Sequence, residues 1–400
     1  MTADPLVPRP WLALQATLAA QLFASFVTAF APVVAPAVAP QLGIAPERVG
    51  LFTATIYLVA MLSGVACASW MGRVGALRST QVVLVCIAGG IALAGAGTAA
   101  MLLLAAVVIG IGHGVVNPAA AVILGRHAPP GSPGLFFAIK QAGVPAGIAL
   151  AGLVLPATLA TIGWQAALFA TAAALVALAV VLIPARPLLD PPSPKTSPAR
   201  QPWVESLLHA AREPSLRRLS FMAMAYATMQ LGFVTYAVSL LVRLGLPLAQ
   251  AAGMLAIAQL ASVITRVTAG HIADRWFPPR RLLSIFGFAM AAASVGLAFL
   301  PASPSVPLVG VVMVIAGATA MGWNGVFFAE LVRVVPRDQL ARAAGGTQFF
   351  LFGGSMLGPF LFSQLLAFGG TYTAGFLALA VLAALAAVTM LGKDASNSDE

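Results

Sequence analysis

Hydrophobic and polar positions alternate along this chain in long blocks, with apolar runs of about twenty residues or more between short charged loops. A run of about 20 apolar residues spans the hydrocarbon core of a bilayer as an α-helix, and backbone groups in that core must be paired within the chain. The runs are too uniformly apolar for barrel strands, which alternate over about ten residues. We therefore predict an all-α membrane protein with twelve transmembrane helices, at 11–39, 49–71, 79–98, 101–124, 134–156, 163–184, 216–243, 249–273, 281–300, 306–332, 342–367 and 371–391.

The segment 185–215 interrupts this pattern. It contains ARPLLDPPSPKTSPARQP, which is rich in proline and serine and carries mixed charge. Such a composition is typical of a solvated linker. It divides the chain into a six-helix bundle at 1–184 and a second six-helix bundle at 216–400, and we expect a short amphipathic surface helix from Trp203 to Arg218 at its end.

The two halves repeat one another. The stretch 110–147 recurs 207 residues later, and a second offset of 202 relates the loop Leu42-Gly43-Ile44 to Leu244-Gly245-Leu246. Because each half has an even number of predicted spans, both run in the same direction, which indicates a parallel repeat about an axis along the membrane normal. The landmarks in register are Gly110 with Gly317, Asn117 with Asn324, Pro129 with Pro336, Gln141 with Gln348, and Gly147 with Gly354.

Lysine and arginine residues are distributed unevenly between the predicted loops. If both termini face the cytoplasm, seventeen of the 21 fall in cytoplasmic segments and two, Arg48 and Arg243, on the opposite side. This bias predicts that both termini are cytoplasmic. The net charge of +10 is spread over short loops rather than gathered in a patch, which argues against a nucleic-acid partner.

Composition narrows the class of protein further. Hydrophobic residues make up 60% of the chain and charged residues only 8%, whereas soluble domains carry about 25% charged residues. Cys67 and Cys86 both lie in apolar runs, so no disulfide framework or metal site can be built from them. The sequence has no phosphate-binding loop, no HExxH and no paired carboxylates in a span, so we expect no cofactor, no ATP drive and no enzyme activity. We expect a monomer in the inner membrane, with the lipid bilayer and a small molecule as partners.

A loop motif follows the predicted second and eighth helices. Its second copy has Gly270, Asp274, Arg275, Arg280 and Arg281 in the pattern G-x-x-x-D-R/K-x-G-R-R/K, with Trp276-Phe277-Pro278-Pro279 in place of the short step that contains glycine. Its first copy keeps Arg73 and Gly75, while Ala68 and Gly72 replace the first glycine and the acid. With twelve spans in a 6+6 arrangement and a long central loop, the chain resembles the major facilitator superfamily (MFS) over nearly all of its length.

That resemblance implies transport by alternating access, with a central cavity lined by helices 1, 2, 4, 5, 7, 8, 10 and 11. Independently of the resemblance, buried polar groups are costly in hydrocarbon and normally face a bundle interior or water. The amides of six predicted spans fit this arrangement because they lie on helices 4, 5, 7, 8, 10 and 11: Asn117, Gln141, Gln230, Gln259, Asn324 and Gln348.

Two cations are placed inside predicted spans, Lys140 in the first half and Arg266 in the second. Neither has an acidic residue three or four positions away on its own helix, and an uncompensated buried cation is costly. A bound anion would remove that cost, and the planar fork of arginine suits a carboxylate. We therefore predict a divided anion site, and the alternative is that the two cations snorkel or pair with Glu330, Asp274 or helix carbonyl groups.

Other polar residues complete the candidate site. Gln141, Asn117, Asn324 and Gln348 are candidates for contact with the substrate, with helix-to-helix hydrogen bonding as the alternative. His113 and Glu330 are candidates for proton coupling; the alternatives are a neutral, satisfied histidine and a salt bridge from Glu330 to Arg333 or Lys140. The aromatic candidates for shaping the cavity, with packing or gating as the alternative, are Tyr57, Tyr236 and Trp323.

Together these observations predict a secondary active transporter that moves a small organic anion, a mono- or dicarboxylate, by proton symport or exchange. Two alternatives stay open at this point. One is an exporter of neutral or amphiphilic compounds that uses the amides and aromatic residues, and the other is a substrate sensor built on a transporter fold.

Overall fold

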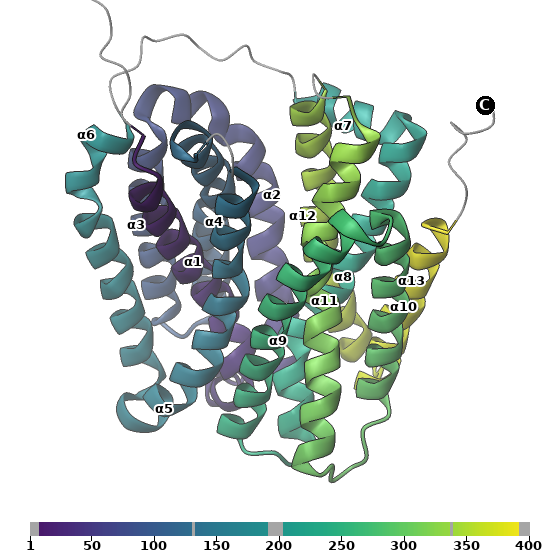
Figure 1. Ribbon diagram of the computed structural model, residues 1–400. Helices are drawn as coiled ribbons and strands as arrows, with labels where there is room; N and C mark the ends of the chain where they lie inside the picture. The colour runs from purple at the N-terminus through teal and green to yellow at the C-terminus, as the bar shows by residue number, and fades with distance from the viewer. Residues whose placement is uncertain (1–7, 130–132, 191–202, 337–338, 392–400) are drawn as a thin grey trace, which may run out of the picture.

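The protein folds as two bundles of long helices that stand side by side (Figure 1). The computed structural model describes residues 8–129, 133–190, 203–336 and 339–391, and no β-strand occurs in those four ranges. Short 3-10 turns lie at Pro40–Leu42, Pro46–Arg48 and Ile183–Ala185. The helices are α1 (Pro10–Val38), α2 (Val49–Val74), α3 (Ala76–Ala94), α4 (Ala99–His127), α5 (Pro133–Val181), α6 (Arg186–Leu189), α7 (Trp203–Arg212), α8 (Pro214–Arg243), α9 (Leu248–Arg275), α10 (Pro279–Ala298), α11 (Val306–Val334), α12 (Leu340–Ala367) and α13 (Tyr372–Thr389).

Eleven helical units in the described residues are long and apolar enough to cross a membrane, where the sequence predicted twelve spans. The difference lies in α5, which joins the predicted spans 134–156 and 163–184. Gly163 in this unit has φ 79° and ψ 167°, so two helical segments meet there at a sharp change of direction. Glycine adopts this backbone conformation without the steric cost that a side chain would add.

The structure describes part of the predicted linker, and its segment 191–202 lies outside the described residues. In the segment 203–215, α7 ends at Arg212 and α8 begins at Pro214, so the surface helix is shorter than the predicted 203–218. Proline at the start of α8 is favoured because the first helical position needs no backbone N–H.

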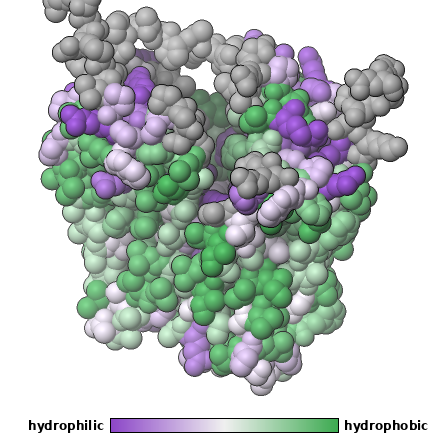
Figure 2. Space-filling model, viewed as in Figure 1, coloured by the Kyte–Doolittle hydropathy of each residue, from purple (hydrophilic) through white to green (hydrophobic). Residues whose placement is uncertain are grey.

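α1 begins and α13 ends at the same end of the molecule, the upper end in Figure 1. We call this end the terminal face and the opposite end the distal face. On the side of the molecule seen in Figure 2, a broad band of hydrophobic residues lies between hydrophilic residues gathered at the two faces. Large exposed apolar side chains such as Val181 and Ile264, 71% and 67% exposed, belong to the sides rather than the core. Such a surface is what a protein surrounded by lipid requires.

Matching glycines bring matching helices into close contact in the two halves. A Cβ on Gly110 of α4 would lie 2.7 Å from the carbonyl O of Ile56 in α2. A Cβ on Gly317 of α11 would lie 2.2 Å from the carbonyl O of Ala258 in α9. Ile56 and Ala258 are 202 residues apart, as the loop repeat is, so one helix contact recurs in both bundles.

The second pair of repeated glycines makes a second repeated contact. A Cβ on Gly147 of α5 would lie 2.2 Å from the carbonyl O of Leu22 in α1. A Cβ on Gly354 of α12 would lie 2.0 Å from the carbonyl O of Met224 in α8. Leu22 and Met224 are again 202 residues apart. The repeat seen in the sequence therefore preserves the sites where two helix backbones touch.

The two bundles meet along α5 with α9, α2 with α12, and α1 with α8. Small residues allow this approach too, since a Cβ on Gly152 of α5 would lie 2.5 Å from the carbonyl O of Ala252 in α9. A Cβ on Gly50 of α2 would lie 2.3 Å from the carbonyl O of Pro359 in α12. Small residues at helix interfaces let backbones pack where lipid removes the usual hydrophobic drive.

We predict that Gly317→Ala destabilises the protein because the added methyl group would overlap the Ala258 carbonyl group of α9. Overpacking of this kind costs about 1–3 kcal/mol. Gly253→Ala in α9 is the matched control, since a Cβ there meets nothing within 4 Å and alanine improves helix propensity by up to about 1 kcal/mol. Thermal unfolding in detergent measures both, and equal melting temperatures would contradict the packing assignment.

Candidate functional site

Lys140 lies in the interior of the first bundle and is 2% exposed. Its Nζ donates to Gln21 Oε1 at 2.7 Å, to Gln141 Oε1 at 3.0 Å and to Asn117 Oδ1. An ammonium group has three hydrogens, so three amide oxygens satisfy it completely. These oxygens come from α1, α4 and α5, so Lys140 ties three helices together.

α1 supplies its part of this cluster through a polar face. Thr17, Gln21, Ser25 and Thr28 are buried and recur every three or four residues, which places them on one side of the helix. Gln21 Nε2 donates to Ser25 Oγ at 3.2 Å, which leaves Gln21 Oε1 to face Lys140. The close contact of Gly147 with α1 holds this face against α5.

The positive charge of Lys140 is hydrogen-bonded but not neutralised. Among the described residues, no carboxylate lies within 4.0 Å of its Nζ. Amide oxygens share the charge only as dipoles, and a buried charge is normally paired with an opposite one. Among the side chains that the structure describes, none supplies a negative charge to pair with Lys140.

Arg266 of α9 reaches the same region from the second bundle. Its Nη1 donates to the carbonyl O of Gln141 at 3.1 Å and its Nη2 to the carbonyl O of Met321 at 3.0 Å. Its buried Nε has no hydrogen-bond partner in the described part of the chain. Gln141 thus contacts both cations, through its side chain to Lys140 and through its backbone to Arg266.

Both acceptors of Arg266 are helix carbonyl groups, one of the alternatives that the sequence left open for this cation. Within the side chains that the structure describes, which do not include that of Asp274, no carboxylate lies within 4.0 Å of the guanidinium. The two cations that the sequence placed in opposite halves meet at one residue of α5.

A cavity of about 400 Å³ lies between the two bundles, and Figure 2 shows a hollow there at the terminal face. Its walls come from α2 and α4 on one side and from α11 and α12 on the other, with α7 contributing Ser206 and Leu207. Two of its polar side chains are predicted site residues, Asn117 from α4 and Gln348 from α12. Because Asn117 also accepts a hydrogen bond from Lys140, the cavity wall is in direct contact with the buried charge.

Aromatic side chains connect this cavity to His113. The Tyr57 ring lies 5.5 Å from the His113 ring, edge to face, and 6.3 Å from the Phe352 ring, measured between centroids. Phe352 lines the cavity and His113 is 7% exposed. His113 Nδ1 is buried and has no partner within the ranges that the structure covers.

Glu330 forms a salt bridge with Arg333 of its own helix, α11. It is 3% exposed, and Arg333 Nε and Nη2 donate to its two carboxylate oxygens at 2.8 and 2.7 Å. This is the salt bridge to Arg333 that the sequence allowed as an alternative. Glu330 therefore does not compensate Lys140.

Trp323 lies in the packed interior of the second bundle, and Asn324 beside it is half-buried. Trp323 is fully buried, and its ring packs edge to face on Tyr226 at 5.5 Å. Trp323 Nε1 and Asn324 Nδ2 both donate to Gln230 Oε1, at 3.2 and 3.4 Å. The structure brings these residues to one another and not to the wall of the cavity between the bundles.

Tyr236 lies at the distal face and is fully buried there. Its hydroxyl is 2.8 Å from the carbonyl O of Glu47, which belongs to the turn before α2, and Ser363 Oγ of α12 donates to the same oxygen at 3.1 Å. Arg243 Nη1 lies 3.9 Å from Glu47 Oε1. Tyr236 was predicted to shape the cavity, with gating as the alternative, and its position joins the two bundles at the end away from the cavity.

The residues of the loop motif gather at the terminal face. Arg280 Nε donates to the carbonyl O of Met390 at 2.9 Å, which ties α10 to the end of α13. Arg73 and Arg281 are exposed, and Gly270 lies inside α9. The side chains of Asp274 and Arg275 lie outside the described ones.

Sequence reasoning missed three contributors. The first is Gln21, which the spacing of the polar residues on α1 could have revealed. The second is Asp190, whose carboxylate accepts from the backbone N–H groups of Ala76 and Arg78 at 2.9 Å each and so caps α3 where the first loop motif lacks its acid. The third is α7, which was expected on the surface but contributes to the cavity wall.

We predict that Gln21→Leu lowers thermal stability because Lys140 loses one of three acceptors. A hydrogen bond to a charged group contributes about 1.5–3 kcal/mol. The matched control is Gln41→Leu, which removes an exposed glutamine from the turn that follows α1. We expect it to change the free energy of unfolding by no more than about 0.5 kcal/mol. If both variants unfold at the wild-type temperature, the amide cluster does not hold Lys140 as described.

We further predict that Tyr236→Phe shifts the protein towards states with an open distal face. The lost hydrogen bond contributes about 0.5–1.5 kcal/mol, which corresponds to a roughly two- to tenfold change in population. Spin labels at exposed Gln41 and Gln250, in a background without Cys67 and Cys86, report the distance between bundles there. Tyr226→Phe is the control, since its hydroxyl bonds Leu283 within one bundle; an equal shift in both variants would contradict the prediction.

The fold of this chain was compared with those of known proteins. No curated protein matches the chain. Among solved structures, a bacterial homologue of the human lysosomal transporter Spinster, inward-facing and occupied, is 18% identical with a TM-score of 0.74, covering 94% of this chain and 95% of that one. The nucleoside transporter NupG is 14% identical with a TM-score of 0.76, covering 95% and 99%.

A further neighbour is a POT family transporter in complex with 5-aminolevulinic acid, 14% identical with a TM-score of 0.75 and covering 94% and 95%. At these identities the neighbours establish the fold. Residues 17–345 also match the sequence profile of the Major Facilitator Superfamily, which covers more than half of the chain. This protein is therefore a multi-pass membrane protein and a transporter that belongs to the Major Facilitator Superfamily.

Proposed function

We propose that the protein is a secondary active transporter of small organic anions, mono- or dicarboxylates, which it carries across the inner membrane by alternating access. The observation that carries this proposal is the meeting of Lys140 and Arg266 at Gln141 without a carboxylate among the described residues. A cargo with a carboxylate would supply the missing negative charge and would gain from donors already held in place.

The position of the cations supports a cargo that interacts with both bundles. Lys140 and its amide partners belong to the first bundle, and Arg266 to the second. An anion held between them would couple the approach of the bundles to binding, since each bundle contributes one charge. The cavity at the terminal face supplies a route, because its Asn117 wall also contacts Lys140.

The distal contacts support the assignment of this arrangement to one stage of a transport cycle. Tyr236, Ser363 and Arg243 of the second bundle all contact Glu47 of the first, while the terminal face is hollowed. Alternating access requires the reverse arrangement as well, in which the Glu47 contacts separate and the terminal face closes. We infer that the terminal face is cytoplasmic, from the charge bias of the loops.

For the drive, we propose proton symport or anion exchange. His113 supports proton symport, because its Nδ1 is buried without a hydrogen-bond partner in the described chain. Its ring contacts Tyr57, which in turn contacts Phe352 in the cavity wall. Glu330 is the weaker candidate, since Arg333 holds both of its oxygens. Uptake into proteoliposomes with and without an imposed pH gradient distinguishes symport from exchange.

One observation favours the second candidate function, export of neutral or amphiphilic compounds. Phe328, Phe349 and Phe352 line the cavity together with Met61 and Val65, so its walls are largely apolar. A cargo with an apolar body would fit these walls with or without a carboxylate. The effect of substituting Lys140 and Arg266 on ligand binding decides between the two candidate functions.

We predict that carboxylates raise the melting temperature of the purified protein and that Arg266→Gln and Lys140→Gln each weaken this binding at least tenfold. One lost ionic hydrogen bond of about 1.5–3 kcal/mol corresponds to such a factor. Arg126→Gln, which removes an exposed arginine at the end of α4, is the control for net charge. Uncharged amide analogues that stabilise wild type and both variants equally would reject the anion site and favour the exporter.

A further inference from the structure

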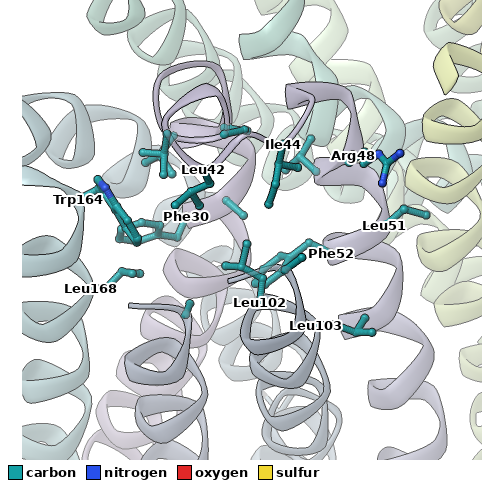
Figure 3. Close-up of a pocket in the computed structure, with 18 of the residues that line it drawn as sticks. Phe30, Leu42, Ile44, Arg48, Leu51, Phe52, Leu102, Leu103, Trp164 and Leu168 are labelled. Atoms are coloured by element: carbon teal, nitrogen blue, oxygen red, sulfur yellow. The ribbon is translucent and has the colours of Figure 1, made fainter. Parts of the chain in front are cut away.

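A second cavity of about 400 Å³ lies within the first bundle, near the distal face (Figure 3). It shares no lining residue with the cavity between the bundles. Phe30, Trp164 and Leu168 form one side of it, and Leu51 and Leu103 form the other. Apart from Arg48, every side chain that lines it in the described chain is apolar.

The mouth of this cavity lies where the turn before α2 approaches the start of α4. Leu103 in this mouth is 55% exposed, and Leu51 and Phe52 are half-buried. Leu103 also belongs to the exposed apolar surface on the sides of the molecule, which faces hydrocarbon in a membrane. An acyl chain could therefore pass from the bilayer into the cavity without crossing water.

Arg48 stands at the rim of the cavity and is exposed. Its neighbour Glu47 is 3.9 Å from Arg243, whereas no carboxylate lies within 4.0 Å of the Arg48 guanidinium in the ranges that the structure describes. Figure 3 shows Arg48 at the edge of the group of apolar side chains. A guanidinium in this position is free to donate two parallel hydrogen bonds to a phosphate.

We propose that this cavity binds one acyl chain of an anionic phospholipid, with the lipid phosphate held by Arg48. The chemistry of the lining carries the assignment: apolar walls match an acyl chain, and one cation at the rim matches an anionic headgroup. The volume falls within the range of about 300–1,000 Å³ of small-molecule sites. A polar solute fits poorly, because the indole N–H of Trp164 and the guanidinium of Arg48 are the hydrogen-bonding groups among the side chains that line the cavity in the described chain.

This site is separate from the proposed transport of organic anions, and either proposal can fail without the other. Native mass spectrometry of the full chain tests it, with phosphatidylglycerol and phosphatidylcholine of identical acyl chains as probes. We expect the wild type to retain one phosphatidylglycerol at least fivefold more often than one phosphatidylcholine. Arg48→Gln should remove this preference, while Arg126→Gln, which removes an exposed arginine at the other end of α4, should keep it.

A second pair of variants tests the cavity itself. Val34→Phe fills it from α1 and should lower retention of both lipids, whereas Val82→Phe adds the same bulk on the exposed side of α3 and should not. If Val34→Phe does not fold, quenching of Trp164 by brominated acyl chains in a single-tryptophan variant replaces it, since Trp164 lines the cavity and is only 9% exposed. Equal headgroup preference in Arg48→Gln and Arg126→Gln, or no effect of filling and no quenching, would overturn the proposal.

Discussion

Close backbone contact between helices at glycine is the constraint on which this structure depends. In lipid, two helices gain little from burying apolar side chains against each other, so packing must come from shape and from short contacts. Gly110 and Gly147 place α4 and α5 directly on the carbonyl groups of α2 and α1, and Gly317 and Gly354 do the same in the second bundle. The polar cluster follows from this, because Gln21 reaches Lys140 only while α1 lies that close to α5.

Most of the fold could be predicted from the sequence because the bilayer restricts the choices. Long apolar runs become helices, and the repeat of glycines and amides indicates two like-oriented bundles before any contact is known. The sequence did not show that residues 157–162, between the two predicted spans, are helical up to the change of direction at Gly163. It also could not show that Asp190 caps α3, because the two are more than a hundred residues apart.

The candidate site could be predicted less completely. Lys140 and Arg266 were identifiable because a cation in an apolar run is rare and costly. Their partners were not, since the three amide oxygens that accept from Lys140 come from three helices whose rotation the sequence leaves open. For the same reason the sequence could not show that Tyr236 and Trp323 lie away from the cavity. The sequence around an aromatic residue in a span is the same whether its side chain lines a cavity, packs within a bundle or joins two bundles.

The contact at Glu47 has a further consequence for how this protein can vary. Two hydroxyl groups of the second bundle converge on its carbonyl oxygen, an atom of the main chain that every amino acid possesses. Substitution at position 47 can remove the ionic attraction to Arg243 but leaves that oxygen in place. The hydrogen bonds to that oxygen can therefore be changed through Tyr236 and Ser363, so sequence change in the second bundle alone can alter how readily the two bundles separate on this side.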